Sequence, residues 1–136
     1  MTSAKHGPGF HHVALRASDY DATLAFYATG LGFERAYGWG EPGNRAAMLA
    51  VGDGNYIEVF EGSGEGGEIP EGALLHYAVR AADAAASYER AIAAGATTVS
   101  EPRTLAIQGD RVVTVHIAFV KGLDGEVIEF FQNEVL

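Results

Sequence analysis

The chain has 136 residues, the size of one ordinary domain, and it contains no cysteine. Hydrophobic residues make up 48% of it and charged residues 20%, a balance that favours a folded protein over a disordered chain. Nine basic residues against 18 acidic ones give a formal charge of −9, which disfavours binding to nucleic acid. The absence of cysteine excludes disulfides, thiolate metal sites and cysteine nucleophiles.

Two further classes are disfavoured by the pattern of apolar residues. No apolar run approaches the roughly 18 residues that a membrane-spanning helix needs. The opening Met-Thr-Ser-Ala-Lys-His-Gly-Pro lacks the apolar segment of a secretory signal. We therefore expect no membrane partner and a cytoplasmic location.

The chain contains an internal repeat. Residues 12–22 agree with residues 76–86 at six of eleven positions, at an offset of 64. Residues 53–60 agree with residues 124–131 at five of eight positions, at an offset of 71. Two matches in the same order indicate duplicated modules. We expect one domain over residues 1–136, built from module one (10–61), a glycine-rich connector (62–72) and module two (73–133).

Each module has the same predicted order of elements, βαβββ, so the fold class is α+β. In module one, a helix capped by Ser18 or Asp19 and ended by Gly30 or Gly32 separates the first strand from three others. The strands are expected at 10–17, 33–39, 45–51 and 55–61. Module two has a helix over 83–94 that ends at Gly95, with strands at 74–80, 97–100, 112–120 and 126–132. The stretch 101–111 has no assignable pattern, and large apolar side chains such as Trp39 and Phe60 are expected in the core.

Strand alternation separates the polar residues of the repeat from the core. His12 and Arg16 share one face of the first strand, and His76 occupies the matching position in module two. Glu58 and Glu129 also lie at matching positions, each among bulky apolar neighbours. A single such residue is typical of an ordinary sheet. Recurrence of both types in both modules indicates a divalent metal site of two imidazoles and two carboxylates, suited to Zn, Ni, Co, Mn or Fe(II).

Three segments resemble the vicinal oxygen chelate superfamily, which includes glyoxalase I, extradiol dioxygenases and bleomycin-binding proteins. They are His12-Val-Ala-Leu-Arg16 followed by Ser18-Asp19, Gly-Leu-Gly-Phe at 30–33, and Asp124-Gly-Glu-Val-Ile-Glu129-Phe. The resemblance covers about residues 10–133. It implies paired βαβββ modules whose strands form a cup-shaped mixed sheet around a metal.

The resemblance also implies roles for individual residues. The metal ligands of the superfamily lie on the first and last strands of each module, which here are His12, Glu58, His76 and Glu129. This set of two histidines and two glutamates is most similar to bacterial glyoxalase I. Arg16 matches an arginine that binds the glutathione carboxylate in that enzyme. Gly62 stands where that enzyme has an asparagine for glutathione.

The expected function is that of a metal-dependent lyase or isomerase of the glyoxalase I type. Its substrate would be a small carbonyl compound or its thiol adduct. Glu129 would abstract the proton beside the carbonyl, and the metal would stabilise the resulting enediolate. Two alternatives stay open: a non-haem Fe(II) dioxygenase that uses His12, His76 and Glu129, or a non-catalytic drug-binding protein of the bleomycin-resistance type.

The expected assembly is a homodimer. Each module alone is small for independent stability, and many small members of the superfamily complete the cup between two chains. His12 and Glu58 of one chain would then share a metal with His76 and Glu129 of the other chain.

Overall fold

The structure, a computed structural model, describes residues 9–62, 72 and 74–136, so most of the predicted 62–72 connector lies outside the described residues. The chain divides into two compact units, Met1–Gly66 and Gly67–Leu136. Each unit contains one four-stranded mixed sheet and the βαβββ order, which confirms the predicted α+β class. No helix in the described part of the chain is long and apolar enough to cross a membrane.

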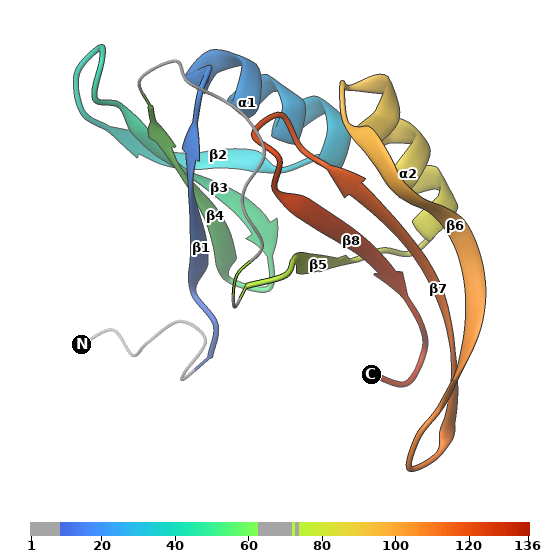
Figure 1. Ribbon diagram of the computed structural model, residues 1–136. Helices are drawn as coiled ribbons and strands as arrows, with labels where there is room; N and C mark the ends of the chain where they lie inside the picture. The colour runs from blue at the N-terminus through green and yellow to red at the C-terminus, as the bar shows by residue number, and fades with distance from the viewer. Residues whose placement is uncertain (1–8, 63–71, 73) are drawn as a thin grey trace, which may run out of the picture. The chain divides into compact units, whose positions relative to one another are not determined.

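Unit 1 carries the first six regular elements, one helical segment and four strands in the order that the sequence predicts, with η1 continuing the helix (Figure 1). Its sheet has the strand order β1-β4-β3-β2, in which β1 runs parallel to β4 and the other neighbours are antiparallel. Helix α1 packs against β4 and continues into a short π-helical segment, η1. The elements are β1 His12–Ala17, α1 Tyr20–Phe26, η1 Tyr27–Leu31, β2 Glu34–Trp39, β3 Ala46–Gly52 and β4 Asn55–Glu61.

Unit 2 repeats this arrangement. Its strand order is β5-β8-β7-β6, again with the first and last strands of the unit parallel to each other. Helix α2 packs against β6, β7 and β8 (Figure 1). The elements are β5 Tyr77–Arg80, α2 Ala84–Ala93, β6 Thr97–Gln108, β7 Val112–Lys121 and β8 Val127–Gln132.

Both helices are capped by an aspartate: Asp19, one of the two predicted caps, and Asp83, the first residue of the predicted range 83–94. The Asp19 side chain accepts a hydrogen bond from the backbone N–H of Ala22 at 3.0 Å, and Asp83 accepts one from Ala86 at 3.1 Å. Each cap satisfies one of the backbone donors that a helix N-terminus leaves unpaired. The first helical segment ends at Gly32, whose φ of 76° lies in the left-handed region that glycine adopts without strain.

The strand β6 is longer than the sequence predicts. It extends through 101–108, where the sequence offers no assignable pattern, and pairs with β7 along its whole length. Pro102 lies within a shift of the β6–β7 register between Ser100 and Arg103, where a missing N–H costs no ladder hydrogen bond. The register shift interrupts the alternating pattern in the sequence, although Thr97–Gln108 forms one strand.

The core lies between each helix and its own sheet. Alternate residues of the central strands face the helix and are almost fully buried, whereas the residues between them face the other side. In unit 1 the buried apolar set includes Tyr20, Phe26, Tyr27, Ala47, Leu49, Ile57 and Val59. In unit 2 it includes Ala84, Tyr88, Ala91, Ala118, Val120, Ile128 and Phe130. The faces opposite the helices carry the candidate metal ligands.

Candidate functional site

In unit 1, His12 and Glu58 form a close pair on two parallel strands. His12 begins β1, and the residue two positions later, Ala14, lies opposite Glu58 in β4. The two side chains therefore meet diagonally on one face of the sheet. His12 Nε2 lies 3.4 Å from Glu58 Oε1. The imidazole is 38% exposed and the carboxylate only 12%, so the carboxylate lies deeper than the ring.

In unit 2, His76 and Glu129 repeat this pair. His76 directly precedes β5, and the residue two positions later, Ala78, lies opposite Glu129 in β8. His76 Nε2 lies 3.1 Å from Glu129 Oε1, with the ring 35% exposed and the carboxylate 11% exposed. Matching residues, strand register and burial show that both halves of the repeat keep the same local geometry.

The other sides of the two histidine rings have different neighbours. The Nδ1 atoms of His11 and His12 lie 2.9 Å apart, within hydrogen-bonding distance. In unit 2 the residue before His76 is Leu75, and the ring of His76 packs edge-on against Phe119 with centroids 5.2 Å apart. A hydrogen bond therefore orients one imidazole, whereas an aromatic contact orients the other.

Each pair brings together one neutral-imidazole donor and one carboxylate donor, the ligand types that borderline divalent metals accept in the absence of thiolate. The described residues contain no cluster of three or more His, Asp or Glu side chains that could hold a metal ion by themselves. Each unit thus offers two of the four predicted ligands. The joint site of His12, Glu58, His76 and Glu129 stays a prediction.

Arg16 lies on β1 on the same face as His12 and is exposed. Its guanidinium forms no hydrogen bond or ion pair with any other described residue. A Cβ atom at Gly62 would lie 2.6 Å from the carbonyl oxygen of Ala17 and 2.8 Å from Cγ of Arg16. Any larger residue at 62, asparagine included, would therefore displace this packing.

Three aromatic side chains are exposed on the Glu58 face of unit 1. Tyr37 is 64% exposed, Trp39 40% and Phe60 38%, so the expectation of Trp39 and Phe60 in the core is wrong. The rings form a chain, with centroids 5.7 Å apart between Tyr37 and Trp39 and 6.3 Å apart between Trp39 and Phe60. Alternation along β4 places Phe60 on the same face as Glu58, so the sequence pattern itself indicates that Phe60 lies beside the candidate ligands and away from the core. These three residues are called the aromatic face below.

A sequence model of the Glyoxalase/Bleomycin resistance protein/Dioxygenase superfamily matches residues 9–130. The chain belongs to this superfamily. It is 31% identical over 125 residues to the uncharacterized protein YwbC of Bacillus subtilis, a match that covers 90% of this chain and 95% of YwbC. It is 33% identical over 128 residues to a probable lactoylglutathione lyase of Vibrio cholerae, covering 90% and 89% of the two chains.

Several solved structures share the fold. The protein SMU.1112c superposes with a TM-score of 0.72 at 28% identity, over 94% of this chain and 99% of that one. Glyoxalase I of Zea mays gives a TM-score of 0.75 at 23% identity, over 91% of this chain and 44% of that one. The fosfomycin resistance protein FosX of Listeria monocytogenes gives 0.68 at 19% identity, over 94% and 95%. The last two identities are low, so those two likenesses concern the fold alone.

Proposed function

We propose that this chain is a metal-dependent lyase or isomerase of the glyoxalase type. Its substrate is a small carbonyl compound or the adduct of such a compound with a thiol. The repeated His–Glu pair carries the proposal, because the superfamily fold alone supports several activities. The similarity to a probable lactoylglutathione lyase of Vibrio cholerae supports the same reaction class.

His12, Glu58, His76 and Glu129 would together hold one divalent cation. Their side chains fit such an ion, since each imidazole presents Nε2 beside a carboxylate oxygen on an open strand face. A bound cation would supply the Lewis acid that polarises the substrate carbonyl.

Glu129 is the proposed general base. Its carboxylate is only 11% exposed, and Phe119 lies opposite it in the β7–β8 pair. The carboxylate lies beside the His76 ring on the open strand face, within reach of a substrate bound there. Glu129 takes the proton from the carbon beside the carbonyl and returns it to the neighbouring carbon, which leaves the substrate isomerised and the enzyme unchanged.

The remaining groups of unit 1 suit the rest of a substrate. The guanidinium of Arg16 is available for a carboxylate, and the aromatic face of Tyr37, Trp39 and Phe60 can cover an apolar group. Because Gly62 has no room for an asparagine, recognition of a thiol adduct here would depend on Arg16 and the aromatic face.

The first test is metal binding. Protein reconstituted with Zn²⁺, Ni²⁺, Co²⁺ or Mn²⁺ is expected to bind about one ion per chain, measured by elemental analysis after dialysis. His12→Ala and His76→Ala should each lose most of this metal. His116→Ala is the matched control and should keep it, because His116 pairs with Gln132, on the opposite face of the unit 2 sheet from Glu129. Full metal content in His12→Ala and His76→Ala would refute the ligand set.

The second test is turnover of the hemithioacetal of methylglyoxal and glutathione by the metal-loaded protein. Glu129→Gln should lower kcat about 100-fold or more, the usual contribution of a general base. Glu101→Gln, an exposed change on β6, is the control and should leave kcat unchanged. If Glu129→Gln binds the metal and keeps full activity, the role of Glu129 is wrong.

The aromatic face favours a second candidate, a non-catalytic protein that sequesters an aromatic ligand. Exposed aromatic rings that lie next to one another, here in a tilted and an edge-to-face pair, are typical of ligand-binding surfaces. Trp39 is the only tryptophan of the chain, so its fluorescence reports directly on this surface. Quenching by an aromatic ligand in metal-free protein, with no turnover after metal is added, would favour sequestration over catalysis.

A further inference from the structure

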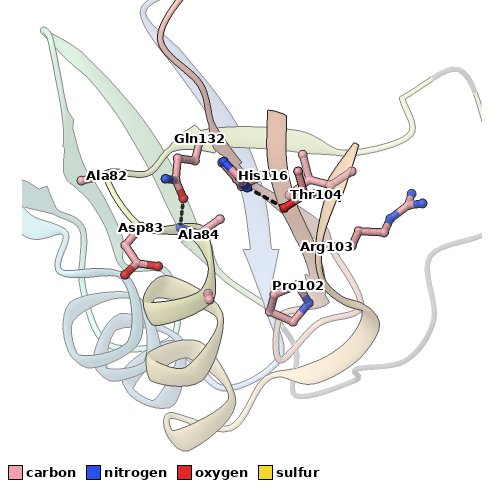
Figure 2. A pocket seen from close by; sticks show the side chains of 10 residues that line it. Ala82, Asp83, Ala84, Pro102, Arg103, Thr104, His116 and Gln132 are labelled. Atoms are coloured by element: carbon pink, nitrogen blue, oxygen red, sulfur yellow. Dashed lines mark hydrogen bonds between the residues drawn. The ribbon is translucent and has the colours of Figure 1, made fainter. Parts of the chain in front are cut away.

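Unit 2 contains a cavity of about 370 Å³ at the start of helix α2, on the side of the sheet that faces the helix. Figure 2 shows part of its wall, with Asp83, Ala84, Pro102, Arg103, His116 and Gln132. Ala85 and Thr104 also line the cavity. Gln132 and His116 are neighbours across the β7–β8 pair. Strand alternation places Gln132 on the opposite face of β8 from Glu129, so the cavity is separate from the proposed reaction site.

The repeat identifies the corresponding place in unit 1. The two helix caps, Asp19 and Asp83, match at the offset of 64, so Tyr20 corresponds to Ala84. On the strands the offset is 71, and the carbonyl of Arg45 accepts a hydrogen bond from the N–H of Glu61, which places these two residues side by side. Arg45 therefore corresponds to His116, and Glu61 to Gln132.

In unit 1 the side chains of Tyr20, Arg45 and Glu61 occupy the space that corresponds to the cavity. The Tyr20 ring is 6% exposed, and the guanidinium carbon of Arg45 lies 4.5 Å above its centre. Arg45 is held by Glu61 through bonds of 2.9 and 3.0 Å and by Asp21 at 3.3 Å. The Tyr20 ring, packed against the Arg45 guanidinium, thus fills the space between the start of α1 and the sheet. We call Tyr20, Arg45 and Glu61 the unit 1 cluster.

In unit 2 all three members of this cluster differ at once. Alanine replaces the phenol ring, histidine replaces the guanidinium, and an amide replaces the carboxylate. The change removes an aromatic ring and the two charges at these three positions. The wall of the remaining space carries the uncharged polar groups of Thr104, His116 and Gln132, together with the charged residues Asp83 and Arg103. Its volume falls in the range of roughly 300–1,000 Å³ that is usual for small-molecule pockets.

The polar atoms on the cavity wall are partly engaged within unit 2. His116 Nδ1 lies 2.7 Å from the hydroxyl of Thr104, which leaves its Nε2 for another partner. The Gln132 side-chain oxygen accepts the N–H of Ala84 at 2.8 Å, which leaves the amide NH₂ as a donor. The N–H groups of Ala84 and Ala86 at the start of α2 are both hydrogen-bonded within unit 2, so neither is available to bind an anion.

We propose that this cavity binds a small phenol-class molecule whose ring takes the place that Tyr20 fills in unit 1. The ring packs against Ala85 and Pro102, next to the buried Ala84, and the hydroxyl hydrogen-bonds to His116 Nε2 or to the Gln132 amide. The site is a second ligand site of the chain, and it works independently of the metal-dependent reaction.

The probe for this proposal is p-cresol, which has the structure of a tyrosine side chain. Its addition to ¹⁵N-labelled protein should shift the amide resonances of Ala84, Thr104, His116 and Gln132 in a saturable way, with a Kd in about the millimolar range for so small a ligand. Ala84→Tyr should fill the cavity and abolish these shifts. Ala93→Tyr, the same change at an exposed position of α2, should preserve them.

A second variant keeps the test valid if Ala84→Tyr fails to fold. His116→Ala, a change of a half-buried side chain, should raise the Kd for p-cresol roughly tenfold through loss of one hydrogen bond. The absence of saturable shifts in the wild type, or equal shifts in Ala84→Tyr, would overturn the proposal. Inorganic phosphate in place of p-cresol should leave these resonances unmoved. Shifts with phosphate alone, or shifts that follow protein concentration without any probe, would show an anion site or a second copy of the chain instead.

Discussion

At the scale of single residues, the tautomer of His12 matters for metal binding. A histidine that binds a metal through Nε2 carries its proton on Nδ1 and donates it to a nearby acceptor. His11 Nδ1 lies 2.9 Å from His12 Nδ1 and can be that acceptor. His76 has no such neighbour in sequence, since Leu75 precedes it and is 72% exposed. The two halves of the repeat thus keep the ligands but support them differently.

We expect His11→Ala to weaken the binding of Zn²⁺ roughly tenfold, because ligands that lose an orienting hydrogen bond commonly lose that much affinity. Isothermal titration calorimetry measures this change. His11→Asn, which keeps an acceptor oxygen, should restore part of the affinity. Leu75→Ala is the matched control at the same position of unit 2 and should bind Zn²⁺ like the wild type. Equal affinities in all four proteins would show that His11 does not position His12.

At the scale of elements, the carboxylate of Glu61 ties the loop before β3 to the end of β4. Besides the Arg45 guanidinium, it accepts the backbone N–H groups of Gly43 and Arg45, each at 3.0 Å. These bonds, with the Arg45 side chain foremost, lower the pKa of Glu61 from 4.5 to about 2. Burial raises the pKa of the nearby Tyr20 phenol. The positive charges of Arg35 and Arg45 act in the opposite direction and lower that pKa, but burial has the larger effect.

A carboxyl group whose pKa is lowered by folding stabilises the native state above its unfolded pKa and loses that contribution as the pH falls. The Glu61 contribution should therefore be complete at pH 6 and decline between about pH 5 and 2. We expect Glu61→Gln to be less stable than the wild type at pH 6, with a difference that shrinks toward pH 2. Urea unfolding at several pH values measures it. Glu41→Gln, in the same loop, should show no such trend, and a constant difference for Glu61→Gln would contradict the assignment.

Much of the fold was predictable because its signals are local. The caps at Asp19 and Asp83, the glycine that ends the first helical segment and the alternation along β4 and β8 depend only on neighbours in sequence. The length of β6 was not predictable, because Pro102 interrupts the pattern at a register shift that only pairing with β7 reveals.

The candidate site divides in the same way. The His–Glu pairs were expected from the repeat, and each pair is close within its own unit. Exposure of Trp39 was not expected, since hydrophobicity predicts burial without regard to which face a helix covers. The cavity of unit 2 could not be predicted, because it depends on a small residue, Ala84, at the position where unit 1 has Tyr20. The absence of a large side chain forms no recognisable motif in the sequence.

At the scale of the whole molecule, each unit holds two of the four proposed metal ligands, and we propose that the active protein is a homodimer in which one site combines two chains. His12 and Glu58 would come from one chain, and His76 and Glu129 from its partner. A twofold dimer then has two equivalent sites, and metal binding stabilises the assembly because the ligands come together only in the dimer.

Mixing two inactive variants tests this arrangement. His12→Ala and Glu129→Ala chains, dissociated and reassembled together, form heterodimers with one site that carries both lesions and one intact site. If half of the dimers are mixed, activity should return to about a quarter of the wild-type value. Each variant reassembled alone is the control and should stay inactive. Mixed dimers identified by mass spectrometry that recover neither activity nor metal would contradict a shared site.

The alternation along β8 has an evolutionary consequence. Glu129 and Phe131 face away from helix α2, whereas Ile128, Phe130 and Gln132 face toward it. Along β8, residues on the face of the proposed reaction therefore alternate with residues that pack against the helix or line the cavity. Selection for each purpose acts on alternate codons of one short stretch of the gene. After a duplication, one copy can replace a glutamate such as Glu61 by a glutamine, as at Gln132, while the glutamate three residues earlier, Glu58 or Glu129, stays unchanged. Two copies of one ancestral unit can in this way keep a common reaction face while their other faces diverge.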